Sequence, residues 1–564
     1  MSKRYLVVGG VAGGASAAAR LRRLSEEDQI IVFEKGPHVS FSNCCLPYYL
    51  GGTVKRAEDL VLMTPEKFAS QYNIDARVNH EVIEIDRGKK EVEVKNLITG
   101  ETYRESYDKL ILSPGARAIV PTIPGIEKAN VFTVRNVVDI ERLHKAIEET
   151  KPSRISVVGG GFIGIEVAEN LVDAGHKVSL IEALPQVLNQ FDYDMVQILH
   201  KELMDQGVDL HVGDRVAAFD TNEVILDSGT KITSEIVVLS IGVTPENELA
   251  KNAGLEVAEN GCIHVDHNYM TNDPDIYAVG DAIEVYNPIM RGYTNLALAG
   301  PAQRQARAVA SHIHNQPVTY HGYIGSSVVK VFNYNAAATG LNERSAIQLG
   351  INCESVKIVP KDKVGLMPDA EELHFKLVFE KPTGRLIGAQ AIGRGNVDKR
   401  IDVVAAAITA RETVEFLKDV ELCYAPPFGS AKDVVNMAGY VASNILNKVF
   451  KHVSITKIRE LVEEGAFIMD VREKYEWDAG HIIGARHIPL SEYRKRLDEI
   501  PRDEPVYIHC RSGQRSYNAV RALQHLGYTK VYNVSGGYIG LCFNEYFNDK
   551  MQDRKPIVTK YDFT

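Results

Sequence analysis

Two cysteines stand in settings that suit sulfur chemistry. The first, Cys44, lies in the stretch Ser40-Phe41-Ser42-Asn43-Cys44-Cys45-Leu46-Pro47-Tyr48-Tyr49, with no second cysteine five residues later. A Cys-x4-Cys pair would carry its own redox disulfide, whereas an isolated thiol must take its sulfur partner from the substrate. Because the thiolate is the nucleophile, we expect Cys44 to have a lowered pKa, helped by a helical turn that opens at Pro47. We interpret Cys45 as a packing residue, since neighbouring cysteines seldom bridge without strain.

The second is Cys510, in His509-Cys510-Arg511-Ser512-Gly513-Gln514-Arg515-Ser516. Gly513 lets the backbone curl, so we expect N–H groups and the start of the following helix to point at the Cys510 sulfur and to stabilise a thiolate or a persulfide.

Two glycine loops indicate dinucleotide binding. Gly159, Gly161 and Gly164 form a full G-x-G-x-x-G between an expected strand, 155–158, and an expected helix, 165–174. Glu182 follows Gly164 by 18 residues, at the end of an expected strand, 177–182. A carboxylate there accepts from ribose hydroxyls and repels a 2′-phosphate, which favours NADH over NADPH.

The loop at the chain start is less regular. Gly9-Gly10-Val11-Ala12-Gly13-Gly14 keeps the outer glycines, Gly9 and Gly14, but has Val11 at the middle position. Glu34, 20 residues beyond Gly14, again provides a ribose acceptor. With a strand at 5–8, a helix at 15–24 and a strand at 30–34, the chain has two nucleotide-binding βαβ units.

Further segments resemble the flavoprotein disulfide reductases. Residues 275–282 resemble the second FAD motif of that family, and residues 112–116 and 240–245 resemble its crossover strands. The resemblance implies that the Asp281 carboxylate contacts the flavin ribityl chain. The FAD-binding residues that it implies are Gly9, Gly14, Glu34, Lys35, Ala116, Gly280, Asp281 and Ala299.

The stretch around Cys44 resembles the single-cysteine site of coenzyme A disulfide reductases. Ser16, Arg20 and Arg23 fall on one helical face, which by spacing alone is either a solvated basic stripe or a phosphate site. The resemblance favours the phosphate site, and it implies coenzyme A contacts at Ser16, Arg20, Arg23, Ser40, Asn43 and Lys432.

Residues 423–433 resemble the dimerisation motif of the same family. There a tyrosine and a lysine reach the active site of the other subunit, which implies a homodimer with these roles at Tyr424 and Lys432. The family's second tyrosine has its best counterpart in Met367 of the segment 365–369. Loss of that hydroxyl favours a persulfide or polysulfide over coenzyme A disulfide as substrate.

The C-terminal part resembles the rhodaneses. Asp470-Val471-Arg472, the segment 480–489 and the Cys510 loop carry this resemblance. The spacing from Cys510 to Arg515 is Cys-x4-Arg, one residue shorter than in the related phosphatases, so sulfur is the expected cargo. The loop residues it implies are Arg511, Ser512, Gly513, Gln514 and Arg515.

Length and patterning predict an α/β protein of several domains. We expect two Rossmann-like domains for FAD and NAD(P), an α+β dimerisation domain with strands at 375–379 and 387–392 and a helix at 398–410, and a rhodanese α/β domain that starts with a helix at 455–464. Residues 448–454 are expected to be a polar junction, and no role is assigned beyond about residue 550. The expected boundaries are 1–115 with 246–325 for FAD, 116–245 for NAD(P)H, 326–447 for dimerisation and 454–549 for rhodanese.

Composition narrows the class of protein. A net charge of -10 argues against a broad nucleic-acid surface, and no run of 18 apolar residues suggests a membrane span. The short apolar run at the N-terminus leads straight into a glycine turn, so it predicts a buried strand rather than an export signal. The seven cysteines form neither a disulfide framework nor a zinc pattern, so we expect no metal and a cytoplasmic location.

These features predict an NADH-driven, FAD-dependent reductase of coenzyme A persulfide, polysulfide or coenzyme A disulfide. Cys44 would form a mixed disulfide with coenzyme A beside the flavin, and Cys510 would handle sulfane sulfur. Two alternatives remain at this point. One is an NADH oxidase or peroxidase that cycles Cys44 through sulfenic acid, although Ala12 stands where such peroxidases usually have a histidine. The other is a sulfur carrier in which the flavoprotein part is a scaffold.

Overall fold

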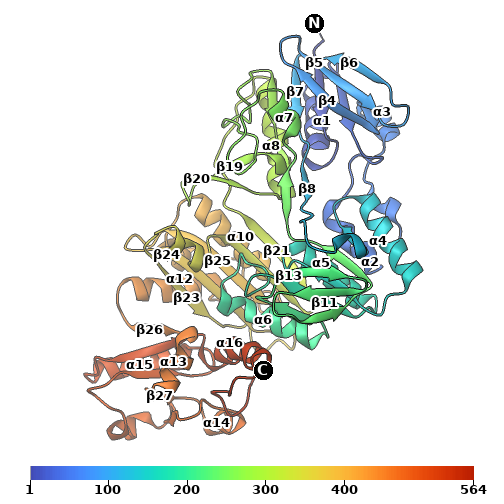
Figure 1. Ribbon diagram of the computed structural model, residues 1–564. Coiled ribbons are helices and arrows are strands. Elements are labelled where there is room, and N and C mark those ends of the chain that lie inside the picture. The colour runs from blue at the N-terminus through green and yellow to red at the C-terminus, as the bar shows by residue number, and fades with distance from the viewer. Residues whose placement is uncertain (1, 564) are drawn as a thin grey trace. The chain divides into compact units, whose positions relative to one another are not determined.

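The structure, a computed structural model, describes residues 2–563 and divides into two compact units (Figure 1). The first comprises Met1–Pro185 and His211–Tyr323, and the second comprises Gln186–Leu210 and Ile324–Thr564. Among the described residues, no helix is both long enough and apolar enough to span a bilayer.

The first unit is built on two parallel five-stranded sheets. The sheet order β18-β7-β1-β2-β3 joins β1 (Arg4–Val8), β2 (Gln29–Glu34), β3 (Asp75–Val78), β7 (Lys109–Leu112) and β18 (Ile276–Ala278). The sheet order β12-β11-β10-β16-β9 joins β9 (Val131–Thr133), β10 (Ile155–Val158), β11 (Val178–Glu182), β12 (Asp209–Val212) and β16 (Ile236–Leu239). The central strands are continuous apolar runs because both faces of a parallel sheet are buried.

Both predicted βαβ units are confirmed. Helix α1 (Ala12–Leu24) follows β1, and α5 (Phe162–Asp173) follows β10. Each helix begins three residues earlier than expected, because the last glycines of each loop already lie in its first turn. Between the two sheets the chain passes through the predicted crossovers, where β8 (Ala116–Ala118) pairs antiparallel with β17 (Val243–Pro245).

Smaller elements complete this unit. Two three-stranded sheets contain β4 (His80–Asp86), β5 (Glu91–Asn96) and β6 (Thr102–Ser106), and β13 (Val216–Asp220), β14 (Glu223–Leu226) and β15 (Lys231–Thr233). A hairpin joins β19 (Glu284–Asn287) and β20 (Gly292–Asn295). The remaining helices are α2 (Leu46–Leu50), α3 (Pro65–Tyr72), α4 (Val137–Thr150), α7 (Glu248–Asn252) and α8 (Ala299–Ile313).

The second unit contains an antiparallel sheet with associated helices, which agrees with the predicted α+β domain. Its order β21-β22-β25-β24-β23 joins β21 (Ser326–Val331), β22 (Tyr334–Gly340), β23 (Cys353–Ile358), β24 (Leu373–Glu380) and β25 (Leu386–Gly393). The associated helices are α6 (Tyr193–Asp205), α9 (Glu343–Gln348), α10 (Val397–Thr409), α11 (Val414–Asp419) and α12 (Val434–Leu446).

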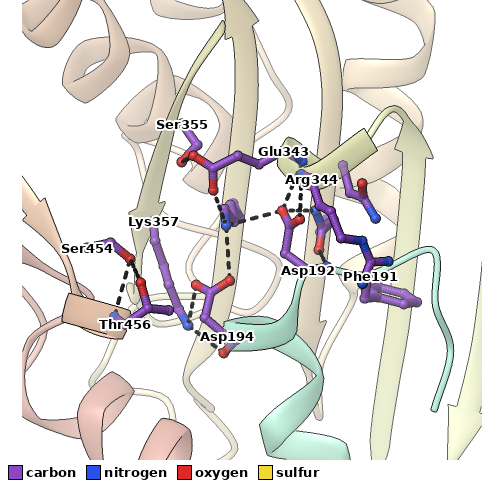
Figure 2. A network of polar contacts seen from close by, with 12 residues as sticks. Phe191, Asp192, Asp194, Glu343, Arg344, Ser355, Lys357, Ser454 and Thr456 are labelled. Carbon is purple, nitrogen blue, oxygen red and sulfur yellow. Dashed lines mark hydrogen bonds and ion pairs between the residues drawn. The ribbon is translucent and has the colours of Figure 1, made fainter. Parts of the chain in front are cut away.

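A buried network of charges ties α6 to this sheet. The Lys357 ammonium, on β23, donates to the Asp194 carboxylate at 3.1 Å (Figure 2). Lys376, on β24, contacts Asp194, Asp192 and Glu343 at 3.0, 3.1 and 2.8 Å. The two lysines hold the pKa of the Asp194 carboxyl well below its usual range despite complete burial. Since buried charges are tolerated only when paired, the network fixes the position of α6 on the sheet.

The same unit contains a five-stranded parallel sheet, β26-β30-β29-β27-β28. Its strands are β26 (Lys451–Ser454), β27 (Phe467–Asp470), β28 (Arg486–His487), β29 (Val506–His509) and β30 (Val531–Ser535). Its helices are α13 (Ile458–Glu463), α14 (Lys474–Ala479), α15 (Gln514–His525) and α16 (Gly537–Met551).

Two details differ from expectation here, and a third concerns the tail, for which the sequence predicted no role. The predicted helix 455–464 is a 3₁₀ turn, Ile455–Lys457, followed by α13. Part of the predicted junction forms β26, which pairs in parallel with β30, because an edge strand can be polar. The tail beyond α16 packs against the unit that contains the parallel sheet. Val558 forms a β-bridge with Ile482, and the Tyr538 hydroxyl donates to the carbonyl of Lys560.

Candidate functional site

Cys44 lies in a 3₁₀ turn, Asn43–Cys45, that leads into α2, and its side chain is exposed. Pro47 stands in the first turn of α2, as expected. The expected lowering of the pKa of the Cys44 thiol is wrong. Desolvation raises the pKa of the Cys44 thiol, and the negative charge of Glu166 adds to this effect. A helix of five residues has too few aligned peptides to offset it.

Arg135, which the sequence did not reveal, holds several of the predicted residues together beside Cys44. Its guanidinium donates to the Asp281 carboxylate at 2.8 Å and to the carbonyl of Ala116 at 2.8 Å. The side-chain amide of Asn43 donates to the Arg135 carbonyl over a longer 3.5 Å. The positive charge of Arg135 lowers the pKa of Cys44, in opposition to Asp281. The first unit thus brings Cys44, Asn43, Ala116 and Asp281 to one place.

The first glycine loop fits a dinucleotide. Gly9 has φ +92°, and a Cβ on it would lie 2.0 Å from the Ser113 carbonyl oxygen. The Glu34 carboxylate accepts from the N–H groups of Gly10 and Gly36 at 2.9 and 2.8 Å. Burial raises the pKa of Glu34. The loop and its acid are therefore joined in the arrangement that FAD binding requires.

The second loop repeats this geometry. A Cβ on Gly164 would lie 1.8 Å from the Gly159 carbonyl oxygen, whereas a Cβ on Gly161 would meet nothing within 4 Å. The open space at Gly161 is where a pyrophosphate can approach the backbone. Glu182 accepts from the N–H groups of Gly160 and Leu184, each at 2.7 Å. These residues fit a nicotinamide dinucleotide.

Three other predicted FAD-binding residues, Gly280, Lys35 and Ala299, lie outside the two glycine loops and their acids. Gly280 has φ +84°, and its N–H donates to the Gln305 side chain at 2.7 Å. The Lys35 ammonium is exposed and lies 3.5 Å from Glu246, and Ala299 is exposed at the first position of α8. Helix α8 packs against the 3₁₀ turn Gly280–Ala282 that contains Asp281, so Ala299 begins an element that lies next to this cluster.

A pocket of about 330 Å³ gathers most of the predicted coenzyme A residues. Ser16, Arg20, Arg23 and Ser40 line it. The Nε atom of Arg20 is buried without a hydrogen-bond partner, and desolvation together with the charges of Arg307 and Arg23 lowers the pKa of Arg20. Such a cluster of cations fits an anionic ligand with several phosphates. The basic stripe is therefore one wall of a pocket.

Sequence reasoning missed the other walls of this pocket. The missed residues are Ala15, Ala19, Met63, Phe68, Tyr72, Gln303 and Arg307. Gln303 and Arg307 lie one turn apart on α8, which packs against α1. Their i, i+4 spacing shows in the sequence that they share one face of a helix, but not that this face lies beside α1. Phe68 and Tyr72 on α3 contribute aromatic walls, and the Arg23 guanidinium lies 5.8 Å from the centre of the Tyr72 ring. Asn43 does not line the pocket.

The predicted dimerisation residues lie on the second unit. Tyr424 and Lys432 are exposed, as are Leu366 and Phe428. The N–H of Val364 donates to the carbonyl of Gly429 at 3.1 Å, so the Met367 segment and the Tyr424 segment are joined. Asp433 caps α12 and pairs with the buried guanidinium of Arg400 at 3.1 Å, which anchors the motif.

The Cys510 loop lies at the carboxyl end of β29 and is followed at once by α15. Gly513 has φ +103°, and its N–H donates to the Cys510 sulfur at 3.1 Å. The Ser516 hydroxyl lies 3.6 Å from the same sulfur. Ser512 is half-buried and Gln514 is exposed. Arg515 makes two hydrogen bonds of 2.6 Å to Glu476, so the curled loop predicted from Gly513 is confirmed.

Protein-family models match three segments of the chain. Residues 3–306 match "Pyridine nucleotide-disulphide oxidoreductase", residues 326–434 match the dimerisation domain of the same family, and residues 454–542 match the "Rhodanese-like domain".

Individual relatives agree. The coenzyme A disulfide reductase of Staphylococcus epidermidis is 35% identical over 441 residues, covering 78% of this chain and 99% of the relative. The structure of reduced Bacillus anthracis CoADR-RHD has a TM-score of 0.94 and 47% identity, covering 96% of this chain and 98% of that one. An NAD-dependent persulfide reductase from A. fulgidus has a TM-score of 0.90 and 33% identity, covering 95% and 99%.

Membership implies FAD and NAD(H) as redox groups, which the two glycine loops fit. The glycine loops, the single cysteine beside Asp281 and the curled cysteine loop agree with these matches along nearly the whole chain. The chain therefore belongs to the pyridine nucleotide-disulphide oxidoreductases related to coenzyme A disulfide reductase, and it is an oxidoreductase that carries a C-terminal rhodanese-like domain.

Proposed function

We propose that the protein uses NADH to reduce coenzyme A persulfide or polysulfide, and also coenzyme A disulfide, through a mixed disulfide between Cys44 and coenzyme A. The observation that carries the proposal is the arginine pocket. Ser40 lines it only four residues before Cys44, so one ligand can place phosphates among Arg20, Arg23 and Arg307 and extend a thiol towards Cys44. Coenzyme A is then a substrate carrier and not a resident cofactor.

The Cys44 step is a thiol–disulfide exchange. The Cys44 thiolate attacks the coenzyme A-linked sulfur of CoA-S-SH, the S–S bond breaks, and HS⁻ leaves, which gives Cys44-S-S-CoA. FAD, when bound, supplies the two electrons from NADH that cleave the Cys44-S-S-CoA disulfide. In the proposal Glu34 binds the FAD ribose, Asp281 the ribityl chain and Glu182 the NADH ribose. Arg135 supports the Cys44 thiolate by its positive charge.

Met367 supports a persulfide over coenzyme A disulfide. A thioether cannot donate the hydrogen bond that a tyrosine hydroxyl offers, so one polar contact to a second coenzyme A is lost. A persulfide ends in a single sulfur and needs no such contact.

We propose that the protein is a homodimer. The exposed Leu366, Tyr424 and Phe428 form apolar surface on the dimerisation domain, and Tyr424 and Lys432 would act in the partner's site. The proposed division is FAD 1–115 and 246–325, NAD(P)H 116–245, dimerisation 326–447 and rhodanese 454–549. β26, which begins at Lys451, and the tail, in which Val558 bridges Ile482, support extending the last domain at both ends.

Cys510 is proposed to accept sulfane sulfur as a persulfide. The Gly513 N–H, which already donates to the Cys510 sulfur, would stabilise the negative charge on the terminal sulfur. Transfer to coenzyme A would regenerate the thiol of Cys510 and make the substrate for Cys44.

Two variants test the proposal. Cys44→Ser should abolish NADH-dependent release of sulfide from preformed coenzyme A persulfide, whereas Cys510→Ser should leave this rate unchanged. Cys262→Ser, which removes a buried thiol of the first unit, is the matched control. NADH oxidation that consumes oxygen or peroxide without stoichiometric sulfide would instead identify an oxidase or peroxidase. NADH turnover that survives in Cys44→Ser would overturn the proposal.

A further inference from the structure

Both arginines of the Cys510 loop are already neutralised by carboxylates. Arg515 is held by Glu476, which lies on α14. The Arg511 guanidinium donates to a single oxygen of Glu372, from Nη2 at 2.6 Å and from Nε at 3.2 Å. Asp562, in the packed tail, lies 3.7 Å from the same guanidinium. Within the described residues, three carboxylates therefore face the two cations of the loop.

Glu372 comes from outside the rhodanese-like sheet. It directly precedes β24 of the antiparallel sheet, in which residues 373–379 are all buried. His374, two residues on, is buried edge-to-face on Phe543 of α16 at 5.2 Å. Lys376 contacts Asp194 at 3.0 Å, and Lys357 contacts the same carboxylate at 3.1 Å, as Figure 2 shows for Lys357. Glu372 is thus a preset partner for Arg511.

The backbone of Arg511 is held as tightly as its side chain. Its carbonyl accepts from the N–H of Ile539 at 3.1 Å, and a Cβ on Gly537 would lie 2.4 Å from that oxygen. The Arg511 backbone is therefore fixed, and an anion bound beside this residue must compete with Glu372 for the guanidinium.

We propose that Glu372 determines which sulfur donor the Cys510 loop accepts, by holding Arg511 so that monoanionic persulfides are favoured over dianionic thiosulfate. This inference rests on the proposed sulfur-accepting role of Cys510.

The two transfers differ in the charge that must be stabilised. With a persulfide, Cys510-S⁻ and RS-S⁻ give Cys510-S-S⁻ and the monoanion RS⁻. With thiosulfate, Cys510-S⁻ and S₂O₃²⁻ give Cys510-S-S⁻ and the dianion SO₃²⁻. The second reaction needs a free cation near the sulfur, and paired arginines provide little net positive potential there.

The test uses the full chain in a Cys44→Ser background and measures how fast Cys510 gains one sulfur atom by intact mass. The donors are thiosulfate and the persulfide of 2-mercaptoethanol, whose only charge is that of the persulfide. Glu372→Gln should raise the second-order rate with thiosulfate by about tenfold and change the rate with the persulfide by less than about twofold. Glu371→Gln removes the same charge from the neighbouring exposed residue and should change neither rate.

A second variant separates charge pairing from a structural role. Glu372→Gln should have no accelerating effect when it is combined with Arg511→Gln, and Arg511→Gln alone should slow thiosulfate further. Equal acceleration with both donors, the same effect from Glu371→Gln, or faster thiosulfate transfer in Arg511→Gln would overturn the proposal. The assay needs neither NADH nor coenzyme A, so failure of the proposed reductase function would not affect it.

Discussion

The Arg135 guanidinium binds the Asp281 carboxylate at 2.8 Å, immediately beside Cys44. The two residues act on the Cys44 thiol with opposite signs, since Arg135 lowers its pKa and Asp281 raises it. Glu166, on α5, adds a second negative charge on the raising side. Desolvation is the largest influence on the pKa of Cys44, and these three charges from separate parts of the first unit adjust it further.

This arrangement predicts a pH-dependent effect of Glu166. Burial raises the pKa of Glu166 to about 7, so the residue is ionised above that pH and neutral below it. Glu166→Gln should therefore speed alkylation of Cys44 by iodoacetamide several-fold at about pH 8.5 and have little effect at about pH 6. Arg135→Gln should slow alkylation, which gives a control of opposite sign. A pH-independent effect of Glu166→Gln would contradict the assignment.

The arginine pocket predicts a binding defect. Arg307→Gln and Arg20→Gln should each raise the KM for coenzyme A persulfide by about tenfold with kcat nearly unchanged, because a charge-assisted phosphate contact is lost in the ground state and the transition state alike. Initial rates of NADH oxidation measure this. Arg291→Gln, at an exposed turn, should behave as the unsubstituted protein. A fall in kcat with an unchanged KM would show that these arginines act on the chemical steps and not on binding of coenzyme A persulfide.

Local motifs were readable from the sequence, and long-range packing was not. The glycine loops, Glu34, Glu182 and the Cys510 loop follow from spacing because each is built within one βαβ or strand–loop–helix unit. Arg307 and Phe68 reach the pocket only because α8 and α3 pack near α1, and no spacing within one helix reports that.

The misjudged features have similar causes. The pKa of Cys44 was misjudged because desolvation of the thiol and the negative charges of Glu166 and Asp281, which are far from Cys44 in the sequence, outweigh a short helix. The Glu372–Arg511 pair was missed because it joins residues 139 positions apart. The strand β26 was taken for a junction because its sequence is polar.

The second loop predicts the choice of nucleotide. Glu182→Ser should lower kcat/KM for NADH and reduce the discrimination against NADPH by about tenfold, since the carboxylate that repels a 2′-phosphate is gone. Parallel titrations with the two nucleotides give the ratio. Glu223→Ser, at a surface strand of the same unit, should leave the ratio unchanged. A ratio unaffected by Glu182→Ser would show that other residues select the nucleotide.

The buried charge network predicts a stability effect. Asp194→Ala should cost about 3–5 kcal/mol, because Lys357 and Lys376 lose a partner in a dry site. The depressed pKa of Asp194 means that its stabilising contribution is present above about pH 4 and is lost as the pH falls further. Thermal unfolding at neutral pH measures the effect. Asp205→Ala, at the exposed end of α6, should cost under about 1 kcal/mol, and equal losses would contradict the account.

The most direct test of the central claim is the mass of the Cys44 adduct. Intact protein is incubated with coenzyme A disulfide, mapped by peptide mass, and measured again after NADH is added. The account predicts one coenzyme A bound through Cys44, released by NADH and absent in Cys44→Ser. A disulfide between Cys44 and another cysteine of the chain, or Cys44 oxidised without coenzyme A, would contradict it.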